Sequence, residues 1–234
     1  MENLNDPNHD VLTKESSILE SKLQRRSFLQ YAGAGAAVVA LTAAGCRKDR
    51  PSPSFTGVTL DFKDDIGVLN YAYALEQLEA AFYEQVASNP PSGFSSSERI
   101  YFNDIRYHEI AHREFFKKAL GTSAIGSLTP DFSSINFSDR TSVLAAAKTF
   151  EDLGVAAYNG AGVRLTTDAY IVIAGQIVSV EARHAAYIRD IISNGSFANS
   201  EVVDASGLDR ALTPDKVLAA AGPFIKTQIN VINL

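Results

Sequence analysis

The chain has 234 residues, of which 46% are hydrophobic and 21% are charged. This composition is ordinary for a soluble globular protein and argues against a largely disordered chain or a polytopic membrane protein. The formal net charge is −6 and no run of Lys or Arg forms a basic patch, so we expect no nucleic-acid partner. The single Cys excludes an intrachain disulfide and a Cys-based zinc finger. Any metal site must therefore use carboxylates and the four His.

Residues 1–45 are predicted to be an export signal. The pair Arg25-Arg26 precedes a Phe-Leu dipeptide and an uncharged stretch rich in Ala and Gly, which ends at Cys46. This order resembles a twin-arginine signal, and the four residues that end at Cys46 resemble a lipobox, although Ala43 stands where Leu is usual. We expect an exported protein of the cell envelope or periplasm, held at the membrane by a lipid on Cys46. The alternative is an uncleaved N-terminal anchor.

The rest of the chain is predicted to be helical. Residues 46–60 are polar and rich in Pro and Ser, and we interpret them as a linker. Four long stretches then show helical periodicity, and a cap or a stop residue bounds each of them. They cover residues 64–87, 95–120, 139–163 and 168–193. Matched lengths predict an all-α four-helix bundle over residues 61–195, with a long crossover between its second and third helices. Residues 196–234 are expected to form a short helix at Pro214 and an apolar tail that packs on the bundle.

Two Glu-x-x-His pairs carry the predicted chemistry. Glu109 and His112 lie in the second predicted helix, and Glu181 and His184 lie in the fourth. Residues i and i+3 of a helix are separated by about 60° of arc and about 4.5 Å of rise, so each pair can face one metal ion. One such pair is weak evidence, because charged helices produce it by chance. Two pairs on alternate helices of one bundle are much stronger evidence.

The other two helices should each contribute an inward-facing Glu. The third helix offers Glu151, which has apolar neighbours and Tyr158 seven residues later. The first helix offers Glu76, with Tyr83 seven residues later, and also Glu79. Glu76 aligns with Glu151 in a weak internal repeat, whereas Glu79 gives the same 30-residue distance to the next Glu-x-x-His pair as Glu151 does. We favour Glu76 and keep Glu79 as a second or alternative ligand.

These motifs resemble those of the ferritin-like superfamily, whose bundles carry a di-metal carboxylate site of four Glu and two His. The Leu-Glu-x-Leu-Glu-x-x-Phe-Tyr run of the first helix resembles exported, desiccation-related members. The resemblance implies that Glu76 and Glu151 are terminal ligands, that Glu109 and Glu181 bridge the ions, and that each His binds one ion. Without metal, such carboxylates would repel one another strongly in a bundle core. Oxygen and imidazole ligands suit two iron or manganese ions, and zinc is compatible with them.

Three tyrosines are candidates to hydrogen-bond the ligand carboxylates, and the alternative for each is an ordinary core aromatic. They are Tyr83, Tyr158 and Tyr187.

The function that the resemblance implies is a membrane-tethered di-metal protein that reacts with O₂ or peroxide as an oxidase, ferroxidase, peroxidase or catalase. The alternatives are a non-catalytic envelope protein that sequesters metal or protects against desiccation, and a bundle that has lost its metal. A further alternative is a zinc protease, because His108 and His112 form a His-Glu-x-x-His string around Glu109. We leave a homodimer open.

Overall fold

The computed structural model describes residues 56–234. The predicted export signal and the lipidation of Cys46 lie outside the described residues. Within the described part, no helix is both long enough and apolar enough to span a membrane.

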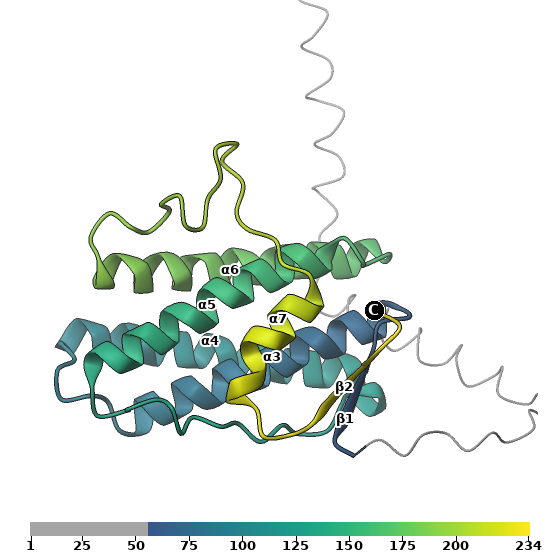
Figure 1. The fold of residues 1–234 in the computed structure, drawn as a ribbon, viewed down its shortest axis with the longest axis horizontal. Coiled ribbons are helices and arrows are strands. Elements are labelled where there is room, and N and C mark those ends of the chain that lie inside the picture. Colours follow the sequence, from purple (N-terminus) through teal and green to yellow (C-terminus); the bar gives the residue numbers. More distant parts are fainter. Residues whose placement is uncertain (1–55) are drawn as a thin grey trace, which may run out of the picture. The chain divides into compact units, whose positions relative to one another are not determined.

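Four long helices form the bundle, as the sequence predicts (Figure 1). They are α3 (Asp65–Ser88), α4 (Ser96–Leu120), α5 (Arg140–Gly162) and α6 (Asp168–Ile192). The closest packing is of α3 against α4 and of α5 against α6. The prediction of an all-α, ferritin-like bundle is therefore confirmed.

Side-chain caps explain where these helices begin. The Asp64 side chain accepts a hydrogen bond from the backbone N–H of Gly67 at the start of α3. Ser95 and Glu98 form a capping box at the start of α4, in which each side chain accepts from the other residue's backbone N–H. Asp139 accepts from two backbone N–H groups in the first turn of α5. Such caps satisfy donors that the helix itself leaves free.

The crossover between α4 and α5 runs along the bundle (Figure 1). It contains one short 3₁₀ helix, η1 (Gly121–Ser123). Side chains of α3 hold the segment in place: Asn70 accepts from the N–H of Ile125 at 2.8 Å, and Gln77 accepts from the N–H of Leu128 at 2.9 Å. The long crossover expected from the sequence therefore packs on α3.

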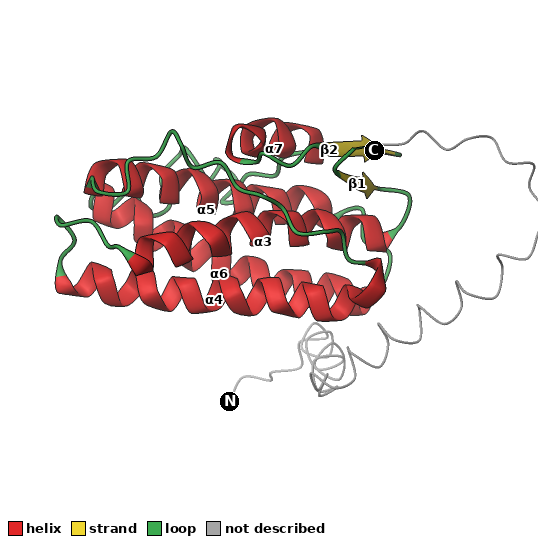
Figure 2. Cartoon of the chain, turned by 90° about the horizontal axis from the view of Figure 1, so that it is seen from below, coloured by secondary structure: helices red, strands yellow, loops and turns green. Residues whose placement is uncertain are grey.

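The part of the C-terminal extension that begins at α7 (Pro214–Ala221) packs on the outer side of α3 and α5, away from α4 and α6 (Figure 2). Helix α7 begins at the proline expected from the sequence, and η2 (Gly222–Phe224) follows it. Phe224 packs edge-on against Phe150 of α5, with 4.9 Å between the ring centroids. The extension therefore packs against the hydrophobic core of the bundle.

The described residues also form a two-stranded parallel sheet that the sequence did not predict. Strand β1 (Val58–Asp61) pairs with β2 (Ile229–Ile232), with Val58 opposite Ile229. The expected linker therefore ends before residue 58, and the apolar tail pairs with a strand as well as packing on the bundle. Four-residue strands give little alternation, and these partners lie far apart in the sequence, so no local pattern indicates the pairing.

Candidate metal centre

Each helix of the bundle contributes a carboxylate to the same region of the core. Glu76 comes from α3, Glu109 from α4, Glu151 from α5 and Glu181 from α6, and all four side chains have no exposed surface. Buried, ionisable side chains are rare in proteins unless they are paired or bind metal. Four of them in one core therefore require a physical explanation.

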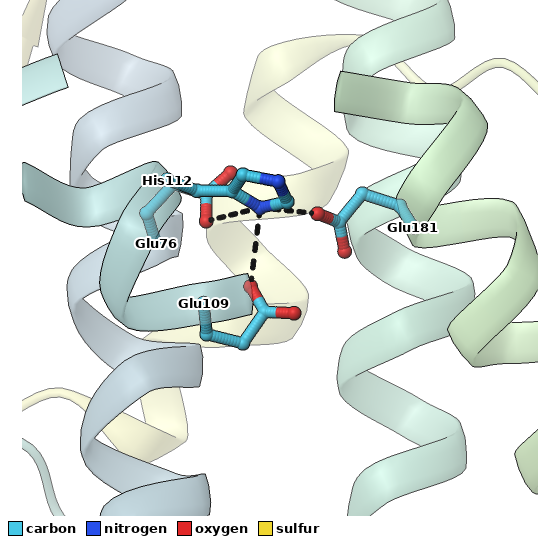
Figure 3. A group of neighbouring side chains, drawn as sticks. All are labelled: Glu76, Glu109, His112 and Glu181. Atoms are coloured by element: carbon cyan, nitrogen blue, oxygen red, sulfur yellow. Dashed lines mark ion pairs between the residues drawn. The ribbon is translucent and has the colours of Figure 1, made fainter. Parts of the chain in front are cut away.

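His112 lies at the middle of one group of ligand atoms (Figure 3). Its Nδ1 lies 2.9 Å from Oε1 of Glu181, 3.5 Å from Oε2 of Glu76 and 3.6 Å from Oε2 of Glu109. These four atoms come from three helices and all lie within 4.8 Å of one another.

His184 lies at the middle of a second group of the same kind. Its Nδ1 lies 2.9 Å from Oε1 of Glu109, 3.4 Å from Oε2 of Glu151 and 3.7 Å from Oε2 of Glu181. Glu109 and Glu181 thus place one carboxylate oxygen in each group, whereas Glu76 and Glu151 each belong to only one group. The arrangement has the form of two adjacent cation positions joined by two shared carboxylates.

Two tyrosines bind the carboxylates of Glu76 and Glu151, which each belong to only one group. Each tyrosine lies on a different helix from the glutamate that it binds. Tyr83 of α3 donates to Oε1 of Glu151 at 2.5 Å, and Tyr158 of α5 donates to Oε1 of Glu76. The Oε2 atoms of both glutamates remain directed at the histidines. Each tyrosine therefore contacts the glutamate of the opposite helix rather than the one seven residues before it.

Tyr187 does not belong to this arrangement. Its ring packs against Tyr101, with 4.5 Å between centroids, and no described hydrogen bond joins it to a ligand carboxylate. The structure therefore does not place Tyr187 among the tyrosines that hold the ligand carboxylates, which are Tyr83 and Tyr158.

Glu79 is buried but lies outside both groups. Its Oε1 lies only 2.9 Å from the position that a Cβ atom would occupy at Gly154. The three-residue offset from Glu76 turns the side chain about 60° around α3. The structure therefore does not support Glu79 as a second or alternative ligand. Its carboxylate instead faces Gly154 of α5, where the absence of a side chain leaves room for it. Burial, followed by the charges of the other glutamates, raises the pKa of Glu79 well above its usual value.

His108 does not share a centre with His112, as a zinc-protease site would require. Its Nδ1 lies 2.9 Å from Nε2 of His184, and His108 belongs to neither group of ligand atoms. From the sequence, His108 was a candidate only for a protease ligand, and its contact with His184 was not predicted. The only signal was its position directly before Glu109.

Protons and charges are tightly linked in this cluster. Burial and the charge of Glu181 raise the pKa of Glu109 to about 8, and burial raises the pKa of Glu151 to about 7. Burial opposes charge on the imidazoles, but the surrounding carboxylates raise the pKa of His112 to about 12 and raise that of His184 as well. Without metal, the cluster therefore takes up protons to reduce its negative charge.

The donor atoms fit a pair of divalent cations. The following buried atoms have no hydrogen-bond partner among the described residues: Glu76 Oε2, both carboxylate oxygens of Glu109 and of Glu181, Glu151 Oε2, and Nδ1 of His112 and of His184. These are the atoms that form the two groups. The charge of four carboxylates would be neutralised by that of two divalent cations. The cations would also bind the buried oxygen and nitrogen atoms that have no hydrogen-bond partner.

Comparison with known families agrees with this architecture. A family model described as a ferritin-like domain matches residues 64–194, which is more than half of the chain. The chain therefore belongs to the ferritin-like family. None of the curated proteins searched matches the sequence. The matched residues include all four bundle helices and both groups of ligand atoms.

Proposed function

We propose that this protein is an exported, membrane-tethered ferritin-like protein that binds two iron or manganese ions in its core and reacts with O₂ or peroxide. One observation carries the proposal of a two-ion site: Glu109 and Glu181 each divide their two oxygens between the groups centred on His112 and His184. A carboxylate shared in this way supports two ions close enough to act together.

The ligand types narrow the choice of metal. Each group offers three carboxylate oxygens and one imidazole nitrogen, and no thiolate. Hard oxygen donors with imidazole suit manganese and iron, and they also accept zinc. Iron and manganese can change oxidation state, so a pair of them would supply a two-electron change to O₂ or peroxide.

The residues of the chain would bind and orient this pair. Tyr83 and Tyr158 each hold one oxygen of a terminal glutamate, which leaves the other oxygen directed inward. The four glutamates have no exposed surface, and His184 is only 5% exposed, so the surrounding bundle excludes most water. Such outer contacts fix ligand orientation and tune a metal centre.

The location at the envelope is supported by sequence alone. Arg25-Arg26 and Cys46 resemble an export signal and a lipidation site. If Cys46 carries the anchor, Cys46→Ser should abolish acyl labelling and release the protein from the membrane fraction. Unchanged membrane retention would contradict lipid anchoring at Cys46.

The test of reactivity uses full-length protein loaded anaerobically with Fe²⁺ or Mn²⁺. We expect the loaded protein to consume O₂, followed with an oxygen electrode, or H₂O₂, followed by its absorbance. Glu151→Ala and His184→Ala should each remove most of this consumption. If the loaded protein consumes neither oxidant, the catalytic proposal fails, and metal sequestration or protection during desiccation becomes the better account.

A further inference from the structure

One histidine contacts the metal-binding cluster from outside. His108 is exposed, and its Nδ1 lies 2.9 Å from Nε2 of His184. The other nitrogen of His184, Nδ1, faces Glu109 and Glu151. The ring of His184 therefore connects the buried carboxylates to a histidine at the surface.

The two rings meet edge to edge. The planes of His108 and His184 differ by only 4°, and their centroids are 5.1 Å apart. Parallel rings whose nearest nitrogens are 2.9 Å apart cannot lie face over face, because the planes would be closer than van der Waals contact allows. The arrangement is that of an N–H of one ring directed at the in-plane lone pair of the other.

Metal binding would fix the tautomer of His184. A neutral imidazole has one N–H and one lone pair. If Nδ1 of His184 gives its lone pair to an ion, its hydrogen must sit on Nε2, which then donates to Nδ1 of His108. An acceptor on the far nitrogen holds the ligand ring in orientation and increases the basicity of the nitrogen that binds metal.

The other half of the centre lacks this support. No hydrogen bond among the described residues involves Nε2 of His112. Val180 precedes Glu181 in the sequence as His108 precedes Glu109. An aliphatic side chain cannot accept a hydrogen bond, so the two halves of the repeat differ at this position.

We propose that His108 is a positioning residue, which holds His184 in its metal-binding tautomer and orientation and makes the position formed with Glu151 the tighter of the two. This inference rests on the proposed function, since it concerns the same two cation positions.

The experiment measures Co²⁺ binding to full-length protein at one position at a time. His112→Ala should leave only the position of His184, and His184→Ala should leave only the position of His112. Adding His108→Ala should weaken Co²⁺ binding about 10- to 100-fold in the His112→Ala variant. It should leave the Co²⁺ affinity of the His184→Ala variant unchanged. It should also shift the visible absorption of bound Co²⁺ in the first variant alone. His108→Gln should restore most of the affinity, because its amide oxygen can accept the hydrogen of His184.

Val180→Ala provides the matched control and should change affinity in neither background. In the otherwise unaltered chain, His108→Ala should lower only one of the two stepwise Co²⁺ affinities. An equal loss in both backgrounds, or no loss in the His112→Ala background, would overturn the inference while two-ion binding stands. Retention of Co²⁺ by His184→Ala but not by His112→Ala would overturn the assigned order of affinity. If the unaltered chain binds no Co²⁺, the proposed function fails and the inference with it.

Discussion

At the scale of single residues, the cluster is organised by how each carboxylate divides its two oxygens. Glu109 and Glu181 share theirs between the two histidines, whereas Glu76 and Glu151 give one oxygen to a histidine and one to a tyrosine. The tyrosine contacts are therefore part of the geometry that directs the ligand oxygens inward.

Removal of these hydroxyls tests that role. Tyr83→Phe and Tyr158→Phe should each weaken metal binding about 10- to 100-fold, because the glutamate loses the contact that orients it. The measurement is a competition titration with a chelator. Tyr187→Phe is the control and should leave affinity unchanged, since its ring packs on Tyr101 away from both groups. If all three substitutions weakened metal binding equally, Tyr83 and Tyr158 would not have the orienting role assigned to them.

Glu79 allows a prediction about stability, because it is a buried carboxyl with a raised pKa outside both groups. A raised folded-state pKa means that the folded protein keeps this proton after the unfolded chain has lost it. The protonated group therefore stabilises the fold below its ordinary pKa of 4.5, and that contribution is lost as the pH rises from there through the raised folded-state pKa.

Glu79→Gln removes this dependence. The variant should resemble the parent near pH 4 and become the more stable metal-free protein as the pH rises, by up to about 1.4 kcal/mol per pH unit until the folded-state pKa is reached. Urea unfolding of the metal-free proteins across this range is the measurement. The metal count should not change. If the free energies of unfolding of the parent and the variant differed by the same amount at every pH, Glu79 would not titrate as described.

Much of the ligand set could be predicted at this scale, and its limits have physical causes. Helical spacing within each Glu-x-x-His pair is local, so Glu109 and His112 could be placed on one face from sequence. The choice of Glu76 over Glu79 depends on the packing of α3 against α5, including the space left by Gly154. The contact of His108 with His184 depends on the register of two helices, which no local pattern encodes.

At the scale of elements, ion pairs link the helices that carry the ligands. The guanidinium of Arg189 on α6 is 4% exposed and contacts both oxygens of Asp152 on α5, at 2.7 and 2.8 Å. It also contacts Asn199 and Glu201 of the following loop. This residue therefore connects two ligand helices to the C-terminal extension.

Arg189→Met should lower the free energy of unfolding by about 1–3 kcal/mol, because Asp152 loses a bidentate partner in a partly buried setting. Urea unfolding monitored by circular dichroism is the measurement. Arg183→Ala, at an exposed position on the same helix, should have an effect near zero. If Arg189→Met and Arg183→Ala lower the free energy of unfolding equally, the contact between Arg189 and Asp152 does not stabilise the packing of α6 against α5.

Helix boundaries were predictable because caps and stops are local. Asp64, Ser95 and Pro214 mark helix starts in both the sequence and the structure. The sheet was not predictable in the same way, because β1 and β2 are four residues each and are brought together only by the completed fold.

At the scale of the whole molecule, metal binding and protonation compete for the same core. In the metal-free protein, burial opposes charge on His112 and His184, but the surrounding carboxylates raise the pKa of both imidazoles and so favour their protonated forms. Cations must displace these protons, so metal affinity should increase as the pH rises. We expect about two or more protons to be released per chain on loading with Mn²⁺, measured in a pH-stat titration. Loading without proton release would contradict the described charge balance.

The most direct test of the central claim is the number and identity of metal ions in full-length protein purified from its native host. The account predicts about two iron or manganese ions per chain, measured by elemental analysis against protein concentration. Glu109→Ala should remove both ions, because this carboxylate serves both positions, whereas Glu151→Ala should remove one. A parent protein with no bound metal, or with a single ion that survives Glu109→Ala, would contradict the account.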